Sequence, residues 1–214
     1  MRQRRSLVAV GRSAFLGAVS ATVAVETAIL DAYCRGQESA LAALFDGKPE
    51  SIEADLTIPI LDAEEGPSRA EQAADAGFDH LKIKAGNDVT TDVERIAAVY
   101  DAAPNTVLKV DANQGWSPKE TKQFATEVDR RGIDLALIEQ PVDKDDLSGL
   151  AYTRDHVDVP VAADESVFSP TDAVAVVRSD AADVLNVKLG KSGPLGAMAI
   201  AAVAEAANLE LMIG

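Results

Sequence analysis

Five charged residues recur at nearly regular intervals, each at the end of a short apolar run. Lys84, Asp111, Glu139, Asp164 and Lys188 follow one another at spacings of 24 to 28 residues. A spacing of this length holds one strand, one helix and two short loops. The apolar runs are rich in Val, Ile and Leu, as buried parallel strands are. The sequence therefore predicts successive β/α units with one charged residue at the carboxyl end of each strand.

A repeated β/α unit that closes on itself forms a TIM-type barrel, in which the strand ends face one pocket. Three carboxylates from neighbouring strands, with no thiol or paired histidine nearby, suit a hard cation that prefers oxygen ligands, which indicates Mg²⁺. Two flanking ammonium groups indicate acid–base chemistry. Any one of these residues alone is equally well explained as a solvated loop residue. Five charged residues at the same position of successive β/α units favour an active site.

The stretches between the apolar runs have helical periodicity, and two start signals are clear. Ser117-Pro118 and Ser169-Pro170 place serine at an N-cap and proline at the first helical position. The first strand is predicted in residues 51–60 and the seventh in residues 209–214. Between the predicted strands, helices are predicted over residues 92–102, 118–131, 145–156, 170–178 and 195–207.

Five strings occur in an order that resembles the enolase superfamily. They are "LKIKAG", "KVDANQGWSPKE", "IEQPVDKDDLSGL", "ADESVFSP" and "NVKLGKSG". Within that superfamily the chain is most similar to the muconate-lactonizing-enzyme subgroup, and closest to dipeptide epimerases of the L-Ala-D/L-Glu epimerase type. The resemblance covers nearly the whole chain from about residue 18 onward.

The resemblance implies roles for the five residues. Asp111, Glu139 and Asp164 would hold Mg²⁺, and Lys84 and Lys188 would stand on opposite faces of the substrate α-carbon. The implied reaction is epimerisation of a dipeptide by two-lysine 1,1-proton transfer through an enediolate. A cation on the substrate carboxylate neutralises the charge that develops when the α-proton leaves.

Lys82 and Asn113 are the supporting residues that the resemblance implies. Lys82 and Lys84 alternate along one strand, so both side chains point to the same face. From its surrounding sequence alone, Lys82 is also explained as a strand-end lysine paired with a neighbouring carboxylate. Asn113 equally suits a turn, since "DANQGW" is good loop chemistry. Trp116 is expected to cover the apolar underside of that loop rather than to contact substrate.

The expected fold is α/β, an incomplete TIM-type (β/α) barrel of seven strands with the eighth missing. Residues 1–50 are expected to be a helical remnant of an otherwise absent α+β capping domain, helical over residues 13–44, and residues 51–214 the partial barrel. The resemblance assigns the substrate's ammonium group to an Asp-x-Asp pair in the missing last stretch, and side-chain recognition to the missing capping loops. Pro194 stands where a second glycine is usual.

Two alternatives to dipeptide epimerisation remain open. One is a cycloisomerase or an o-succinylbenzoate-synthase-like lyase, which uses the same enediolate chemistry. The other is a non-catalytic truncated fragment, because an unclosed barrel exposes two strand edges. Such edges predict either a homo-oligomer or a complementary segment that is missing here.

Composition excludes several classes of partner. A net charge of −15 and a pI near 4.5 argue against nucleic-acid binding, because phosphates would be repelled. There is no long apolar stretch for a membrane, so the expected partner is a small-molecule substrate. The acidic surface is typical of a salt-rich cytoplasm. The start of the chain, with Arg4 and Arg5, also matches a twin-arginine export signal, but Arg12 interrupts its apolar stretch, which favours a cytoplasmic protein.

The remaining candidate ligands are given no functional role. Cys34 is the only cysteine and is expected to be a small buried apolar residue, which excludes disulfides and a cysteine-based metal site. His80 and His156 have no partner motif and are expected to lie at strand or helix edges.

Overall fold

The structure is a computed structural model that describes residues 19–45, 47 and 51–214. The export signal considered at Arg4 and Arg5 lies outside the described residues, as do residues 13–18 of the expected helical remnant. The described residues before the first strand contain helix α2 (Val19–Arg35) and the 3-10 helix η1 (Leu41–Phe45). In the described part of the chain, no helix combines the length and apolar character that crossing a bilayer requires.

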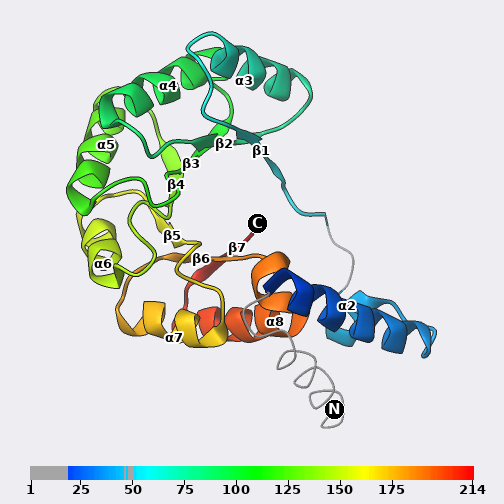
Figure 1. Cartoon of the computed structure of the whole chain (residues 1–214). Coiled ribbons are helices and arrows are strands. Elements are labelled where there is room, and N and C mark those ends of the chain that lie inside the picture. Colours follow the sequence, from blue (N-terminus) through cyan, green and yellow to red (C-terminus); the bar gives the residue numbers. More distant parts are fainter. Residues whose placement is uncertain (1–18, 46, 48–50) are drawn as a thin grey trace.

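One parallel sheet organises the rest of the chain. Its seven strands lie in sequence order, and each is hydrogen-bonded to the next. Figure 1 shows the sheet curled into an open arc with helices along its outside. This confirms the expected incomplete barrel of seven strands. The strands are β1 (Asp55–Ile58), β2 (His80–Lys84), β3 (Val107–Asp111), β4 (Leu135–Glu139), β5 (Val161–Ala163), β6 (Val184–Val187) and β7 (Glu210–Ile213).

A helix separates each pair of consecutive strands. The predicted starts at Ser117 and Ser169 are confirmed, because each forms a capping box with an acidic residue three positions on. The helix predicted over residues 195–207 forms the longer part of α8, which has an additional turn that begins at Leu189. The helices are α3 (Glu65–Asp75), α4 (Val89–Ala102), α5 (Pro118–Arg130), α6 (Leu147–His156), α7 (Pro170–Arg178) and α8 (Leu189–Ala207).

Helix α8 is kinked rather than continuous. Gly193 has φ 68° and ψ 166°, so a first turn after Lys188 is separated from the longer helix that starts at Pro194. Proline cannot donate a main-chain hydrogen bond, but at the start of a helix that donor has no intrahelical partner anyway. Pro194 is therefore accommodated at the first position of the second part, which is why the periodicity indicated only residues 195–207.

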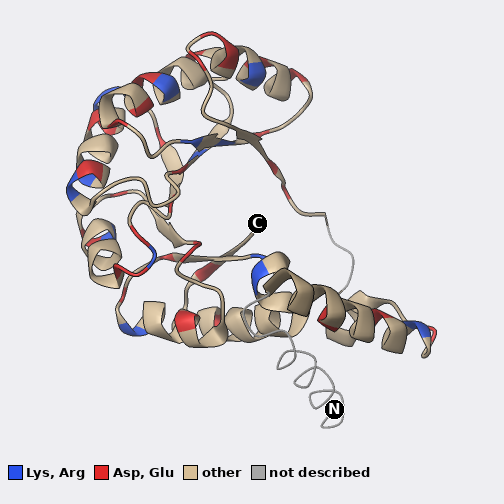
Figure 2. Ribbon diagram, in the orientation of Figure 1, with Lys and Arg blue, Asp and Glu red and all other residues tan. Residues whose placement is uncertain are grey.

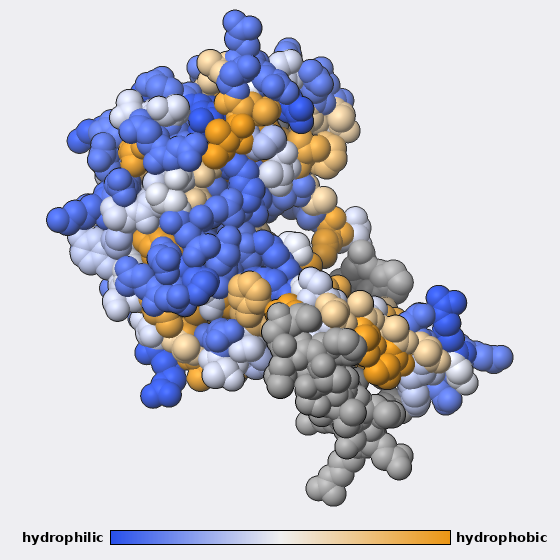
Figure 3. All heavy atoms as spheres, in the orientation of Figure 1, coloured by the Kyte–Doolittle hydropathy of each residue, from blue (hydrophilic) through white to orange (hydrophobic). Residues whose placement is uncertain are grey.

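The apolar core lies between the sheet and the outer helices. Fully buried side chains such as Leu81, Ile96, Ile138 and Leu185 form it. Helix α2 packs against α8, and Cys34 in α2 is buried and unbridged, as expected. Figure 2 shows few charged residues on α8 compared with α3, α4 and α5. In Figure 3 hydrophobic groups gather on the α2 segment, beside a largely hydrophilic face.

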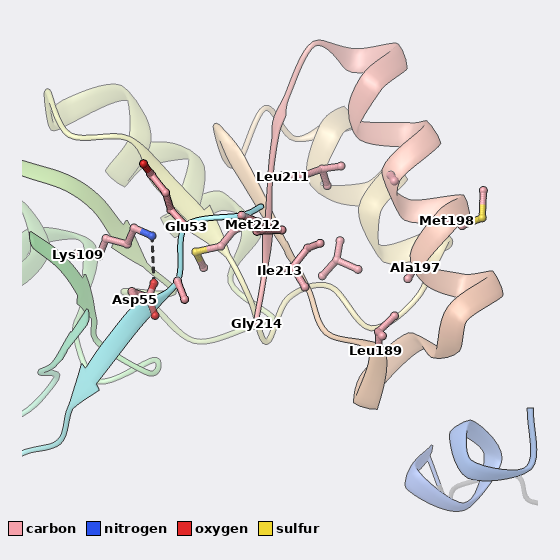
Figure 4. Close-up of a pocket in the computed structure, with 14 residues that line it drawn as sticks. Glu53, Asp55, Lys109, Leu189, Ala197, Met198, Leu211, Met212, Ile213 and Gly214 are labelled. Carbon is pink, nitrogen blue, oxygen red and sulfur yellow. Dashed lines mark hydrogen bonds and ion pairs between the residues drawn. The ribbon is translucent and has the colours of Figure 1, made fainter. Parts of the chain in front are cut away.

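The two ends of the sheet are open. Strand β1 pairs with β2 and β7 pairs with β6, and the order of the sheet ends at these two strands. A groove of about 920 Å³ lies between them. Figure 4 shows Leu211 and Ile213 of β7 and Leu189 and Met198 of α8 around this groove. Ile213 is 70% exposed.

Candidate active site

Strand register brings the first three predicted residues side by side. Lys84 is level with Asp111 on β3, and Asp111 is level with Glu139 on β4. Each is the last residue of its strand. Asp164 and Lys188 are the first residues after β5 and β6. All five therefore lie at the carboxyl edge of the sheet, because the carboxyl ends of parallel strands meet there.

The carboxylates of Asp111 and Glu139 share lysine partners. Lys82 Nζ lies 2.9 Å from Asp111 Oδ2 and 2.7 Å from Glu139 Oε2, and Lys84 Nζ lies 2.7 Å from the same Asp111 Oδ2. Both lysines thus point to one face of β2, as the alternation predicts. Asp111 and Glu139 are at most 1% exposed, so these contacts compensate for the burial of two charges.

The third carboxylate is held by two further lysines. Lys188 Nζ contacts Asp164 Oδ2 and lies 3.9 Å from Glu139 Oε1. Lys191 Nζ lies 2.6 Å from Asp164 Oδ1 and also donates to the main-chain oxygens of Asp164 and Asn186. Three successive carboxylates, from β3 to β5, are therefore flanked by lysines of β2 on one side and by Lys188 and Lys191 on the other.

Burial and neighbouring charges shift the pKa values of the charged residues at these strand ends in different directions. Burial raises the pKa of Glu139, and the charge of Asp111 raises it further against the opposing effect of Lys82. Burial alone would raise the pKa of Asp164, but hydrogen bonds from Lys188 and Lys191 outweigh it and hold the pKa low. For Lys82, burial would lower the pKa, yet the charges of Glu139 and Asp111 raise it above its ordinary value. The two neighbouring carboxylates therefore favour the charged form of Lys82.

The donor chemistry fits a divalent cation, although ammonium groups contact the candidate oxygens. Asp111, Glu139 and Asp164 offer buried carboxylate oxygens, which Mg²⁺ prefers. Burial raises the pKa of Glu139, and the charge of the neighbouring Asp111 raises it further, so two of these carboxylates lie close together. Across the described residues, acids, histidines and cysteines do not form a ready-made metal cluster of three or more. A cation here would compete with the lysines for the same oxygens.

Asn113 and Trp116 occupy the loop after β3. Asn113 Oδ1 accepts from Lys84 Nζ at 2.6 Å, and its Nδ2 donates to Glu165 at 3.1 Å. Its φ of 43° is also that of a turn residue, so a turn conformation is compatible with the contact to Lys84. Trp116 is buried with its ring 4.4 Å from that of Phe124. It covers the underside of the loop, as predicted.

Four residues of the site were not singled out from the sequence: Lys191, Asn186, Gln140 and Glu165. Asn186 lies two positions before Lys188, so strand alternation alone would have placed it on the same face. Its Nδ2 donates to Glu139 Oε1 at 2.8 Å. Gln140 is fully buried, and its Oε1 accepts from the main-chain N–H groups of Asp164 and Ser166. Gln140 therefore fixes the loop that carries Asp164.

The two histidines lie outside this row. His80 Nε2 is 3.0 Å from Glu53 Oε2 at the amino end of β2. The His156 ring stacks on Tyr152 at the end of α6. Both are edge residues, as expected.

Comparison with known proteins assigns the chain to a family. Residues 67–214 match the family model described as Enolase C-terminal domain-like. The chain belongs to this family. The resemblance to the enolase superfamily, stated from five short strings, is thus confirmed over most of the barrel.

Individual relatives of the enolase family agree with this assignment. The chain is 40% identical over 201 residues to the L-Ala-D/L-Glu epimerase of Bacillus subtilis, covering 92% of this chain and 55% of that protein. It spans about half the length of the curated relatives that it matches. A mandelate racemase/muconate lactonizing protein from Herpetosiphon aurantiacus superposes with a TM-score of 0.95 at 34% identity, over 100% of this chain and 61% of that one. A dipeptide epimerase from Enterococcus faecalis, complexed with Mg and the dipeptide L-Leu-L-Tyr, superposes with a TM-score of 0.93 at 31% identity. The match covers 99% of this chain and 60% of that one.

Proposed function

We propose that this chain carries the catalytic row of a Mg²⁺-dependent dipeptide epimerase. One observation carries the proposal: Lys84 and Lys188 stand at opposite ends of a row of three buried carboxylates. Lys84 contacts Asp111 at one end, Lys188 contacts Asp164 at the other, and Glu139 lies between. A substrate bound over Glu139 would have one amine on each side.

Proton transfer in this arrangement needs one neutral and one charged lysine. The neutral amine, of Lys84 or Lys188, removes the α-proton, and the ammonium of the other returns a proton from the opposite face, so the configuration inverts. Lys82 keeps its charge and holds Asp111 and Glu139 in place. Asp111, Glu139 and Asp164 would bind Mg²⁺, which would neutralise the charge that builds up on the substrate carboxylate.

The proposed substrate is a dipeptide of the L-Ala-D/L-Glu type. Its support is that relatives matched over more than nine-tenths of this chain carry that name. A cycloisomerase or o-succinylbenzoate-synthase-like lyase would use the same row of residues. The second alternative is a non-catalytic fragment, because β1 and β7 each leave one strand edge unpaired in the sheet.

Exchange of the substrate α-proton with solvent deuterium tests the proposal. With Mg²⁺ and L-Ala-L-Glu, we expect exchange accompanied by conversion to the other epimer. Lys84→Ala and Lys188→Ala should each abolish inversion, whereas Lys122→Ala on the exposed side of α5 should leave it intact. Full epimerisation by either of the first two variants would refute the two-base assignment. Loss of a β-substituent would instead support the lyase alternative.

The groove between β1 and β7 is a candidate contact surface. Leu189, Met198, Leu211 and Ile213 are 44% to 70% exposed around the groove between β1 and β7. Burying apolar surface and pairing strand edges both favour association. We propose that a second copy of the chain or a complementary β/α segment covers this groove. Native mass spectrometry of the wild-type protein and of Ile213→Lys distinguishes these cases, since a homo-oligomer should weaken in the variant.

The acidic composition supports a proposal about the cellular setting. A net charge of −15 makes the acidic groups of the folded protein repel one another, and salt screens this repulsion. We propose a cytoplasmic protein of a salt-rich cell. Its free energy of unfolding should then rise between low and high salt, and urea titration at several KCl concentrations checks this.

A further inference from the structure

Helix α2 supplies a carboxylate to the segment that follows Lys188. Glu26 lies near the middle of α2 and is only 2% exposed. Its Oε1 accepts a hydrogen bond of 2.9 Å from the main-chain N–H of Leu195. The two residues are 169 positions apart in the sequence, so the bond depends on the packing of α2 against α8, which Figure 1 shows.

The bond is made at the kink of α8. The longer part of that helix starts with Pro194, directly after Gly193, which has no side chain to cap it. A capping side chain normally accepts from an N–H in the first turn. The carboxylate of Glu26 does this from another helix, and its charge lies at the positive end of the helix dipole.

Gly193 is shaped to admit this carboxylate. A Cβ at position 193 would lie 2.8 Å from Oε1 and 2.9 Å from Cδ of Glu26. The φ of 68° is also one that side chains other than glycine rarely adopt. Glycine at 193 and the carboxylate at 26 therefore depend on each other.

One helical turn joins the kink to Lys188. The main-chain N–H groups of Lys191 and Ser192 donate to the carbonyl oxygen of Lys188 at 2.9 and 3.2 Å. From the same turn, the side chain of Lys191 reaches Asp164. Strand β6 fixes one end of this turn and the Glu26 contact fixes the other. Lys84 takes its position from a different part of the sheet, where Asp111 and Asn113 hold it.

We propose that Glu26 is a positioning residue that holds the kink and thereby orients Lys188. The inference rests on the proposed role of Lys188 in proton transfer. Glu26 acts on one of the two lysines only. Its removal should therefore affect proton transfer on one face of the substrate.

Measuring deuterium exchange separately for each epimer of the dipeptide tests this. Lys84→Ala and Lys188→Ala establish which epimer loses its proton to which lysine. Glu26→Ala should slow exchange of the epimer assigned to Lys188 by about 10- to 100-fold and change the other by less than about twofold. Glu26→Gln retains an acceptor oxygen and should recover most of the lost rate. Asp31→Asn, exposed on the same helix, should behave as wild type.

Two outcomes would overturn the inference. Equal slowing of both epimers by Glu26→Ala would mean a general structural role, and no slowing would mean no role.

A measurement independent of activity separates this inference from the proposed function. Glu26→Ala should speed hydrogen exchange of the Leu195, Lys191 and Ser192 amides, with Gly86 and Asn87 unchanged. If the wild-type protein exchanges neither epimer, the proposed function fails. In that case, unchanged protection of the Leu195 amide from hydrogen exchange in Glu26→Ala would still refute the inference that Glu26 stabilises the kink.

Discussion

Replacing Asp92 by alanine should destabilise the protein strongly. Asp92 lies in α4 and is fully buried. Its Oδ2 accepts from the main-chain N–H groups of Gly86 and Asn87 at 3.0 and 2.9 Å and from Trp116 Nε1 at 3.3 Å. Its Oδ1 is paired with Arg95. This one carboxylate therefore joins the loop after Lys84 to the loop after Asp111.

The cost follows from what Asp92→Ala leaves unpaired. Hydrogen bonds to a charged group are worth about 1.5–3 kcal/mol each, and removing one partner of a buried ion pair costs about 3–5 kcal/mol. These terms overlap because one carboxylate makes them all, so we expect a loss of about 4 kcal/mol in the free energy of unfolding. Asp92→Asn keeps an acceptor oxygen but not the charge, and about 2 kcal/mol is expected.

Urea unfolding followed by circular dichroism measures these differences. Asp101→Asn, at the exposed end of the same helix, is the matched control and should change little. The order of destabilisation should be Asp92→Ala, then Asp92→Asn, then the control. A loss below about 1 kcal/mol for Asp92→Ala would refute the reasoning, since it would mean that the buried donors find other partners.

Three further predictions concern the loops and the metal. Gly115→Ala places a Cβ 1.9 Å from the main-chain oxygen of Gly86, so a thermal melt should show a loss of about 3 kcal/mol, whereas Gly190→Ala, with open space around it, should be neutral or stabilising. Gln140→Leu removes four buried hydrogen bonds and should cost about 3 kcal/mol in urea unfolding, and a wild-type value would contradict the account of the Asp164 loop. Mg²⁺ at about 100 times its Kd should raise the free energy of unfolding by about 2.7 kcal/mol, and EDTA should reverse this. Glu139→Gln should abolish the stabilisation by Mg²⁺. Stabilisation that survives in Glu139→Gln would place the cation elsewhere.

Much of the barrel was predictable because its information is local. Apolar runs, serine–proline helix starts and the spacing of charged residues depend on neighbours in the sequence, and they indicated the seven strands and five of the helices. The kink at Gly193 was not predictable in this way. A glycine followed by proline suits a loop as well as a helix start, and the choice depends on what packs against it.

The candidate site also has features that the sequence determined and features that depended on the tertiary structure. Sequence alone determined which residues stand at the strand ends, because a period of two and the length of a β/α unit suffice to align Lys84, Asp111 and Glu139. Only the tertiary structure decided which charges meet: that Lys82 bridges two carboxylates, that Lys191 reaches Asp164, and that Glu26 caps a helix 169 residues away. The physical reason is that buried charges are stabilised by whichever partners the packing brings within hydrogen-bond distance, and such partners leave no pattern in the sequence.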